Sequence, residues 1–296
     1  MTQTHQLLTS QKLYNALLKN ADNRREDGIG LFIEHDGLVI RPFNSGDTLP
    51  ELNADDGQVI LHQDYHLLAQ AARLGWRTAW YNPEGRLAPE PMPIQDADVS
   101  NLGELTNQAS TMDKPTLAQV LAWWADWGLP ENIRRHSQTV AWAAYALGVL
   151  LQHADEPVDP ILAHRGGLLH DLDKLKTLEP EAHHGGVSAD FLQEQGYPKL
   201  AEIVSGHVLH TALQPGADSR PWEERLVFFC DKLAEEDRII PFDRRLDALR
   251  QRYPDFRDVM DRAEPAVWAV NDAICQVLSI PSHEKLIETL IKLQNN

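Results

Sequence analysis

Histidine and aspartate recur in the middle of this sequence at positions that predict a metal site. Of the 13 histidines in the chain, eight fall within 75 residues, at positions 136, 153, 164, 170, 183, 184, 207 and 210. His136 lies inside a predicted helix, His207 lies late in another, and the pair His170-Asp171 ends an apolar helix. Imidazole nitrogens and carboxylate oxygens together suit Zn, Mn, Fe, Co or Ni, and a set without thiolates disfavours a structural zinc site of the cysteine type.

The residues around two of these groups predict that the groups are buried. Asp231 lies in the apolar run VFFCDKLA, beside Phe229 and Leu233. A lone buried carboxylate is costly unless it is paired or bound to a metal. The pair His170-Asp171 follows the sequence GGLL, whose two glycines would allow another helix to approach closely.

The elements that must position these groups are predicted to be helices. After residue 116 the apolar residues recur at helical spacing, no β-rich run appears, and the region is predicted to be all-α. One helix is predicted to stop at Gly128, and the next to begin at Pro130, since proline is favoured in the first turn of a helix. The later helical segments include DPILAHRGGLLHDLDKL, HGGVSADFLQEQG, PKLAEIVSGHVLH and PWEERLVFFCDKLAEED.

The first part of the chain is predicted to be a small α/β domain. Residues 1–25 are predicted to form one helix, because apolar residues recur there at helical spacing. Strands are predicted within 29–41 on both sides of a turn at 35–37, at 58–62 and at 76–82, with a helix at 63–75. This β-α-β order predicts parallel pairing. The proline-rich segment 83–115 is predicted to be mostly loop, with a boundary near 104–116 that separates domain 1–110 from domain 116–296.

The ordered series H…HDxxK…H…H…D on helices resembles the HD superfamily of metal-dependent phosphohydrolases, over about residues 128–255. The matching pieces are RRHS, LLHDLDK, HGGVSA, IVSGH and FCDK. The resemblance implies a mainly α fold with an all-helical HD-type domain and a centre of one or two divalent ions. It implies that the first ion is held by His136, His170, Asp171 and Asp231. His184 and His207 match the branch that holds a second ion, with Asp171 bridging two ions about 3.5–4 Å apart.

Other residues near these motifs are candidates for contacts with substrate. Lys174 lies about one helical turn beyond Asp171, so that its point charge would neutralise a phosphate. Arg135 would do the same or is a solvated surface residue, and Arg238 is a candidate for a second phosphate contact or part of a solvated helix face. His210, three residues after His207, is predicted to lie on the same helix face and to ligate, contact substrate or remain on the surface.

Two further points about the histidines stay open at this stage. His183 precedes His184 directly, so either could be the ligand, and the register of the following GxxxA favours His184. His153 and His164 match no motif position and are expected to be structural.

The N-terminal part looks like fragments of a haloacid-dehalogenase-type phosphatase, but it departs from that pattern at decisive positions. In LFIEHDGLV, Glu34 stands where the nucleophilic aspartate belongs and Leu38 where threonine belongs. A longer carboxylate displaces the attacking oxygen, and a misplacement of about 1 Å can cost about 10²-fold in rate. We therefore expect a non-catalytic partner domain, with residual metal binding by Asp36 and Asp64 as the alternative.

Composition narrows the class of protein. With 27 Lys+Arg against 44 Asp+Glu, the formal net charge of −17 argues against a nucleic-acid partner, because such binding needs clustered cations. Two cysteines are too few for a disulfide framework and fit a reducing cytosol. Neither a signal peptide nor an apolar run of about 18 residues is recognisable, so a cytoplasmic protein without a membrane partner is expected.

Three hypotheses about function remain after these observations. The leading one is a phosphohydrolase that acts on a small phosphorylated substrate, a phosphoester or phosphoanhydride of a nucleotide. The second is an oxygenase with two irons, since a minor branch of HD proteins uses the same His/Asp set for that chemistry. The third is a non-catalytic nucleotide sensor with a structural metal. Lys174 and the arginines beyond Asp231 favour hydrolysis, and the oligomeric state stays open.

Overall fold

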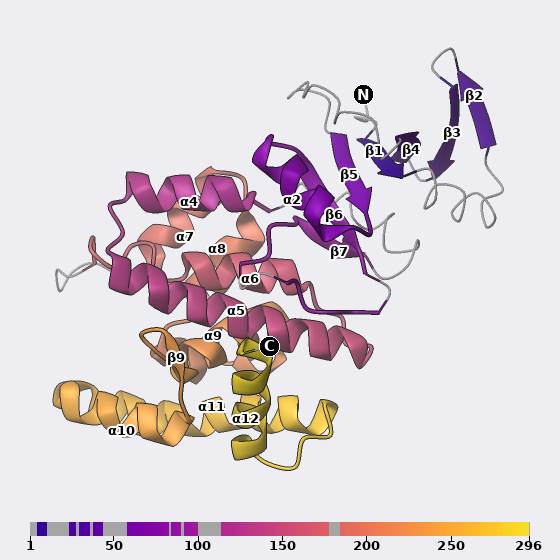
Figure 1. Cartoon of the computed structure of the whole chain (residues 1–296). Coiled ribbons are helices and arrows are strands. Elements are labelled where there is room, and N and C mark those ends of the chain that lie inside the picture. The colour runs from indigo at the N-terminus through magenta and orange to yellow at the C-terminus, as the bar shows by residue number, and fades with distance from the viewer. Residues whose placement is uncertain are drawn as a thin grey trace. The chain divides into compact units, whose positions relative to one another are not determined.

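The computed structural model describes residues 5–10, 24–27, 30–35, 38–43, 58–82, 84–89, 92–99, 114–177 and 184–295. The chain divides into two compact units (Figure 1). The first comprises Met1–Pro89 and Pro93–Leu117, and the second comprises Glu90–Met92 and Ala118–Asn296. The predicted fold class, mainly α with a small α/β part at the N-terminus, is confirmed.

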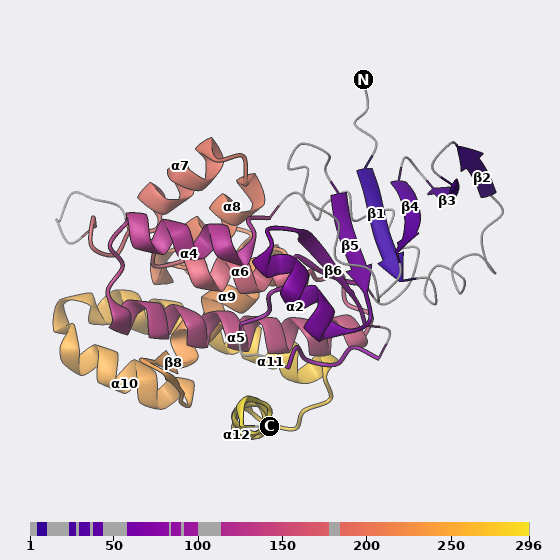
Figure 2. The same cartoon turned by 45° about the horizontal axis from the view of Figure 1, so that its top comes forward.

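The first unit contains a seven-stranded sheet in the order β2-β3-β4-β1-β5-β6-β7 (Figure 2). Its strands are β1 His5–Ser10, β2 Arg24–Asp27, β3 Gly30–His35, β4 Leu38–Phe43, β5 Gln58–His62, β6 Arg77–Tyr81 and β7 Ala97–Val99. Strands β4, β1, β5, β6 and β7 pair in parallel, whereas β2-β3-β4 pair antiparallel. Helix α2, Tyr65–Arg73, connects β5 to β6, so the predicted β-α-β order and its parallel pairing are confirmed.

Local sequence explains the limits of α2. The Asp64 carboxylate accepts hydrogen bonds from the backbone N–H groups of His66 and Leu67, at 2.9 and 3.4 Å, and so caps the first turn. After the helix, Gly75 adopts a left-handed φ of 89°, which glycine reaches without strain. A cluster around Ile60 and Trp76 buries the inner face of α2 against the sheet. Asp64 therefore has a structural role in capping, while Asp36 lies outside the described residues.

Two predictions for the first unit were wrong. Residues 5–10 form strand β1 and residues 24–27 form β2, where one helix had been expected over 1–25; residues 11–23 lie outside the described residues. Strand β1 pairs with β4 on one side and β5 on the other, and tertiary pairing of this kind overrides a weak local helical preference. Strand β7 lies within the predicted loop 83–115 and adds a parallel edge to β6.

The second unit is built from helices. They are α4 Leu117–Asp126, α5 Glu131–His153, α6 Pro160–Leu169, α7 Gly186–Glu194, α8 Pro198–Gly206, α9 Trp222–Leu233, α10 Phe242–Arg252, α11 Arg257–Val277 and α12 His283–Gln294. Short 3-10 helices lie at η2 Leu209–Leu213, η3 Ala217–Ser219 and η4 Pro254–Phe256. The helices predicted from periodicity are confirmed. Within the described part of the chain, no helix has the length and apolar character that crossing a membrane requires.

Helix α6 is the centre of this unit, because all of its residues are buried and it packs against α5, α8 and α9. Asp159 caps its first turn, accepting from the N–H groups of Ile161 and Leu162 at 3.0 and 2.9 Å. A Cβ added at Gly167 would lie 2.5 Å from the Cα of Ala141 in α5, and one at Gly166 would lie 2.6 Å from a methyl of Ile203 in α8. The close helix approach predicted from GGLL is therefore confirmed, and it involves two neighbouring helices.

The second unit is not entirely helical, and the prediction of an all-α region is wrong in this detail. After α9 the chain forms a small antiparallel hairpin, with β8 Ala234–Glu235 paired to β9 Arg238–Ile239. At its turn, Glu236 has a φ of 53°. Arg238, expected on a helix face beyond Asp231, therefore lies on a hairpin, whereas Arg244 and Arg245 lie on helix α10.

Candidate metal centre

Four helices of the second unit and one loop bring the six predicted ligands together. His136 comes from α5 and Asp231 from α9. His170 and His207 are the C-terminal caps of α6 and α8. Asp171 follows α6 directly, and His184 lies just before α7. Because three of the six lie where a helix ends, the packing of the helices decides where these side chains meet.

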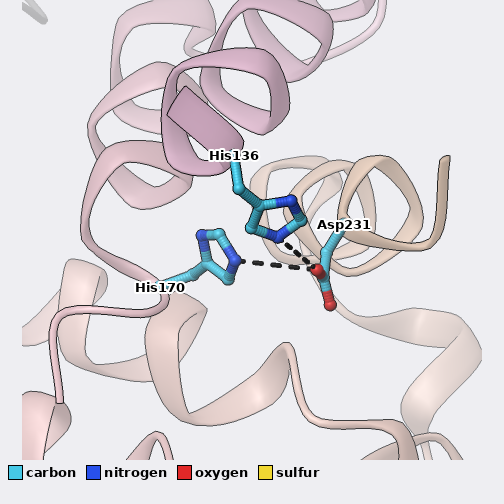
Figure 3. Close-up of side chains that lie close together, drawn as sticks. All are labelled: His136, His170 and Asp231. Atoms are coloured by element: carbon cyan, nitrogen blue, oxygen red, sulfur yellow. Dashed lines mark hydrogen bonds and ion pairs between the residues drawn. The ribbon is translucent and has the colours of Figure 1, made fainter. Parts of the chain in front are cut away.

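His136, His170 and Asp231 form the first candidate group (Figure 3). The Asp231 Oδ1 atom lies 3.0 Å from His136 Nε2 and 3.6 Å from His170 Nε2. One ligand atom from each residue lies within 4.8 Å of the others, which is a spacing that can hold one ion.

His170, Asp171 and His207 form the second candidate group, and His184 lies beside it. Asp171 Oδ2 lies 3.8 Å from His170 Nε2, whereas its Oδ1 lies 2.9 Å from His184 Nε2 and 3.9 Å from His207 Nε2. The two oxygens of Asp171 therefore face different histidines. This arrangement suits a carboxylate shared between two ions, although the residue common to both groups is His170.

Backbone carbonyls fix the orientation of two of the imidazoles. His170 Nδ1 donates to the carbonyl of Gly167 at 2.8 Å, and His207 Nδ1 donates to the carbonyl of Val204 at 2.5 Å. A carbonyl only accepts, so Nδ1 of each ring carries a proton and Nε2 points toward the centre, where it can bind an ion once it is unprotonated. His170 Nε2 is buried without a hydrogen bond. A buried nitrogen in that state fits a metal ligand.

Asp173 is a residue of this site that the sequence reasoning missed. Its Oδ1 accepts from His184 Nδ1 at 2.9 Å, and its Oδ2 accepts from the backbone N–H groups of Gly185 and Ser188 at 2.9 and 3.1 Å. Asp173 is fully buried. A carboxylate that receives the second nitrogen of a metal-ligating histidine orients that ring. The sequence feature that could have indicated this role is the position of Asp173 in LLHDLDK, two residues after Asp171.

The two carboxylates at the centre are ionised. Burial alone would raise the pKa of Asp171, but the His170 charge, the hydrogen bond from His184 and the Lys174 ammonium hold it well below its usual value. Burial has the same effect on Asp231, but the Lys232 ammonium, a hydrogen bond from His136 and the nearby His170 ring lower its pKa well below normal. The centre therefore offers negatively charged oxygen ligands at neutral pH.

The histidines differ in their tendency to accept a proton. Burial lowers the pKa of His207 well below its usual value, and the neighbouring His170 adds to this effect. Burial also acts on His170 and His184, but the carboxylates next to them outweigh it and raise their pKa values. In the absence of a cation, protons on these two rings balance part of the charge of the aspartates.

Two lysines contact the centre in different ways. Lys174 Nζ lies 3.1 Å from Asp171 Oδ1, and its side chain is 43% exposed. Lys232 is buried, pairs with Asp231 and donates to the backbone carbonyl of His207 at 3.0 Å. Lys232 therefore ties α9 to the end of α8, whereas Lys174 is accessible to a ligand.

A cavity of about 930 Å³ opens at the centre and includes most of the predicted contact residues. Lys174, His210 and Arg238 line it, and the Arg238 side chain is 85% exposed. Arg135 is exposed on α5 and is not among the lining residues. His210 lies in η2 and not on the helix of His207; that prediction was wrong because α8 ends at Gly206 and the next residues turn away from the helix axis.

The remaining histidines are placed as follows. His183 lies outside the described residues, so the choice between it and His184 stays a prediction, although His184 contacts the centre. His153 is exposed at the end of α5. His164 is fully buried, with its Nδ1 atom 2.7 Å from the Arg165 guanidinium.

Comparison with known proteins agrees with this site. Residues 133–236 match the family described as the HD domain. An uncharacterized protein of Methanocaldococcus jannaschii is 32% identical over 114 residues, which cover 35% of this chain and 66% of that protein. No solved structure matches the chain. The haloacid-dehalogenase resemblance of the first unit stays a prediction. The second unit therefore contains a match to the HD domain over residues 133–236, which supports the resemblance to the HD superfamily of metal-dependent phosphohydrolases.

Proposed function

We propose that this chain hydrolyses a phosphoester or phosphoanhydride bond of a nucleotide with the help of one or two divalent ions. The observation that carries the proposal is the His/Asp centre at a cavity. Two imidazoles have Nε2 turned inward by backbone carbonyls, two carboxylates are ionised, and an accessible lysine lies beside them. Lys174, His210 and Arg238 are the proposed substrate contacts, and Asp171 with Lys174 forms the proposed catalytic pair.

The residues present fit a divalent transition metal. His136, His170, Asp171 and Asp231 would hold the first ion, and His184 and His207 with Asp171 would hold a second. The buried His170 Nε2 without a hydrogen bond supports this assignment. The donor set of imidazole and carboxylate suits Mn, Fe, Co, Ni or Zn. When bound, such an ion polarises a phosphoryl oxygen and activates a water molecule for attack on phosphorus.

The protein's own residues would bind and orient the substrate. The Lys174 ammonium lies next to Asp171 and remains partly exposed, so a phosphate oxygen can reach it. Burial opposes its charge, but Asp171 and Asp231 raise the pKa of Lys174, so that it stays positive at neutral pH. Lys232 pairs with Asp231 and donates to the backbone carbonyl of His207, so we assign it a structural role.

The proposal is tested by following cleavage of mononucleotides, dinucleoside polyphosphates and cyclic dinucleotides by protein loaded with each candidate metal, with the nucleoside, nucleotide and phosphate products separated and quantified. We expect hydrolysis of at least one class, and its loss in Asp171→Ala. Purified protein that binds no transition metal and cleaves none of these substrates would refute the proposal. Oxygen consumption with an organic substrate would support the oxygenase instead, and tight nucleotide binding without turnover would support the sensor.

A further inference from the structure

The cavity at the metal centre has a second, apolar part that the proposed hydrolysis does not use. Its lining there comes from α10, η4 and the start of α11: Phe242, Leu246, Leu249, Tyr253, Phe256, Val259 and Met260. Figure 1 shows α10 and α11 beside each other, and they contact in the structure. Phe242, Leu246 and Met260 are buried and support the lining from beneath.

Two aromatic residues of this lining are strongly exposed. The exposed fraction is 47% for Tyr253 and 61% for Phe256. Tyr253 directly precedes the short 3-10 helix η4 and Phe256 is its last residue, and the Phe256 N–H donates to the carbonyl of Tyr253 at 3.1 Å. Both side chains line the same cavity and both are open to solvent, so each ring is accessible to a ligand there.

The two aromatic side chains line the same cavity as Lys174 at the metal centre. Arg245 and Arg252 also line the cavity, and Arg245 lies 3.4 Å from Glu235. One cavity thus combines a lysine at the metal centre, two arginines and two exposed aromatic side chains.

We infer that Tyr253 and Phe256 form the subsite for the base of a nucleotide whose phosphate lies at Lys174. The inference rests on the proposed function and adds the residues that select the substrate. Every nucleobase has a π-face, and stacking on an aromatic side chain contributes about tenfold in affinity for each ring, or about 1.4 kcal/mol. A phosphorylated sugar without a base can use Lys174 but cannot use this subsite.

The test compares four nucleoside monophosphates (of adenine, guanine, cytosine and uracil) with ribose 5-phosphate on Mn²⁺-loaded protein. Dissociation constants are measured by calorimetry, and phosphate release is followed in parallel. We expect Phe256→Ala and Tyr253→Ala each to weaken binding of the best nucleotide about tenfold, and to change that of ribose 5-phosphate less than twofold. Tyr253→Phe should retain most of the affinity. Leu121→Ala, which removes an exposed apolar side chain of α4 away from the cavity lining, is the matched control.

The outcomes separate the subsite from the hydrolysis. Ring-dependent binding, with no cleavage of any nucleotide in the wider panel, would support the subsite and refute the proposed function. Phosphate release that does not depend on either ring would refute the subsite and leave the function standing. Equal loss for nucleotide and ribose 5-phosphate, or no nucleotide binding by the wild-type protein, would also overturn the inference.

Discussion

Asp173 provides the sharpest test of how the centre is organised. Its carboxylate accepts three hydrogen bonds: one from His184, and one each from the N–H groups of Gly185 and Ser188 at the start of α7. Asp173→Asn keeps the size of the side chain but replaces one acceptor oxygen with an NH₂ group. The asparagine oxygen can then serve either the imidazole or the backbone groups, but not both.

The magnitude follows from the groups that lose their acceptor. A buried donor without a partner costs about 1–3 kcal/mol, so we expect Asp173→Asn to reduce the free energy of unfolding by about 2 kcal/mol. Loss of an outer carboxylate that orients a histidine ligand lowers metal affinity by about 10–100-fold. The loss should affect the ion held by His184 and His207, while the ion at His136 and Asp231 should remain.

The assay is metal content per chain at a series of buffered free Mn²⁺ concentrations, with thermal unfolding of the metal-free protein in parallel. The wild-type protein should pass from one to two ions at a free concentration about 10–100-fold lower than Asp173→Asn. Ser188→Ala is the matched control, because the Ser188 hydroxyl is buried without a hydrogen bond while its backbone N–H, which Asp173 uses, is retained. Wild-type stoichiometry in Asp173→Asn, or equal weakening of both ions, would show that the reasoning about Asp173 is wrong.

Three other predictions follow from the second unit. Gly167→Ala would place a methyl 2.5 Å from the Cα of Ala141. Overpacking of this kind costs about 1–3 kcal/mol and should lower the melting temperature by about 2–10 °C. An unchanged melting curve would contradict the close approach of α6 to α5. Lys174→Ala should lower kcat/KM for the hydrolysed nucleotide by about 10–100-fold, whereas Arg135→Ala should leave kcat/KM unchanged. Equal effects of the two substitutions in steady-state kinetics would contradict the conclusion that Lys174 lines the cavity and contacts substrate while Arg135 does not. Burial lowers the pKa of His164 well below its usual value, so the unfolded chain takes up a proton that the folded chain does not, and stability should fall as pH drops below about 6.5. His164→Gln should reduce that dependence in denaturant unfolding at pH 5 to 7, and an identical slope would contradict the assignment.

The ligand set was predictable from the sequence because the order of its histidines and aspartates resembles that of the HD superfamily. A histidine or aspartate in an apolar helical segment drew attention to several of these positions, and the resemblance then implied that they meet. The structure brings His136, His170, Asp171, His184, His207 and Asp231 together as expected. Their roles as ligands remain predictions that metal analysis will decide.

Features that depend on long-range contacts were not predictable in the same way. Strand β1 has leucines at a spacing that also suits a helix, and only its pairing with β4 and β5 decides between the two. Asp173 has no special pattern of its own, because its function depends on where α7 begins. Likewise, the hairpin after α9 depends on a turn in which Glu236 has a left-handed φ, and a glutamate does not predict that conformation.

The hydrogen bonds from His170 and His207 to carbonyls three residues earlier restrict which residue types can replace these two histidines as ligands. Each imidazole uses one nitrogen to satisfy an acceptor in the last turn of its own helix, and leaves the other nitrogen for the ion. An aspartate or glutamate at either position has no proton to donate at neutral pH, so it would repel the carbonyl and loosen the end of the helix. His136 makes no such bond in the described structure and lies in mid-helix. Carboxylates should therefore be tolerated in related sequences at position 136 more readily than at positions 170 and 207.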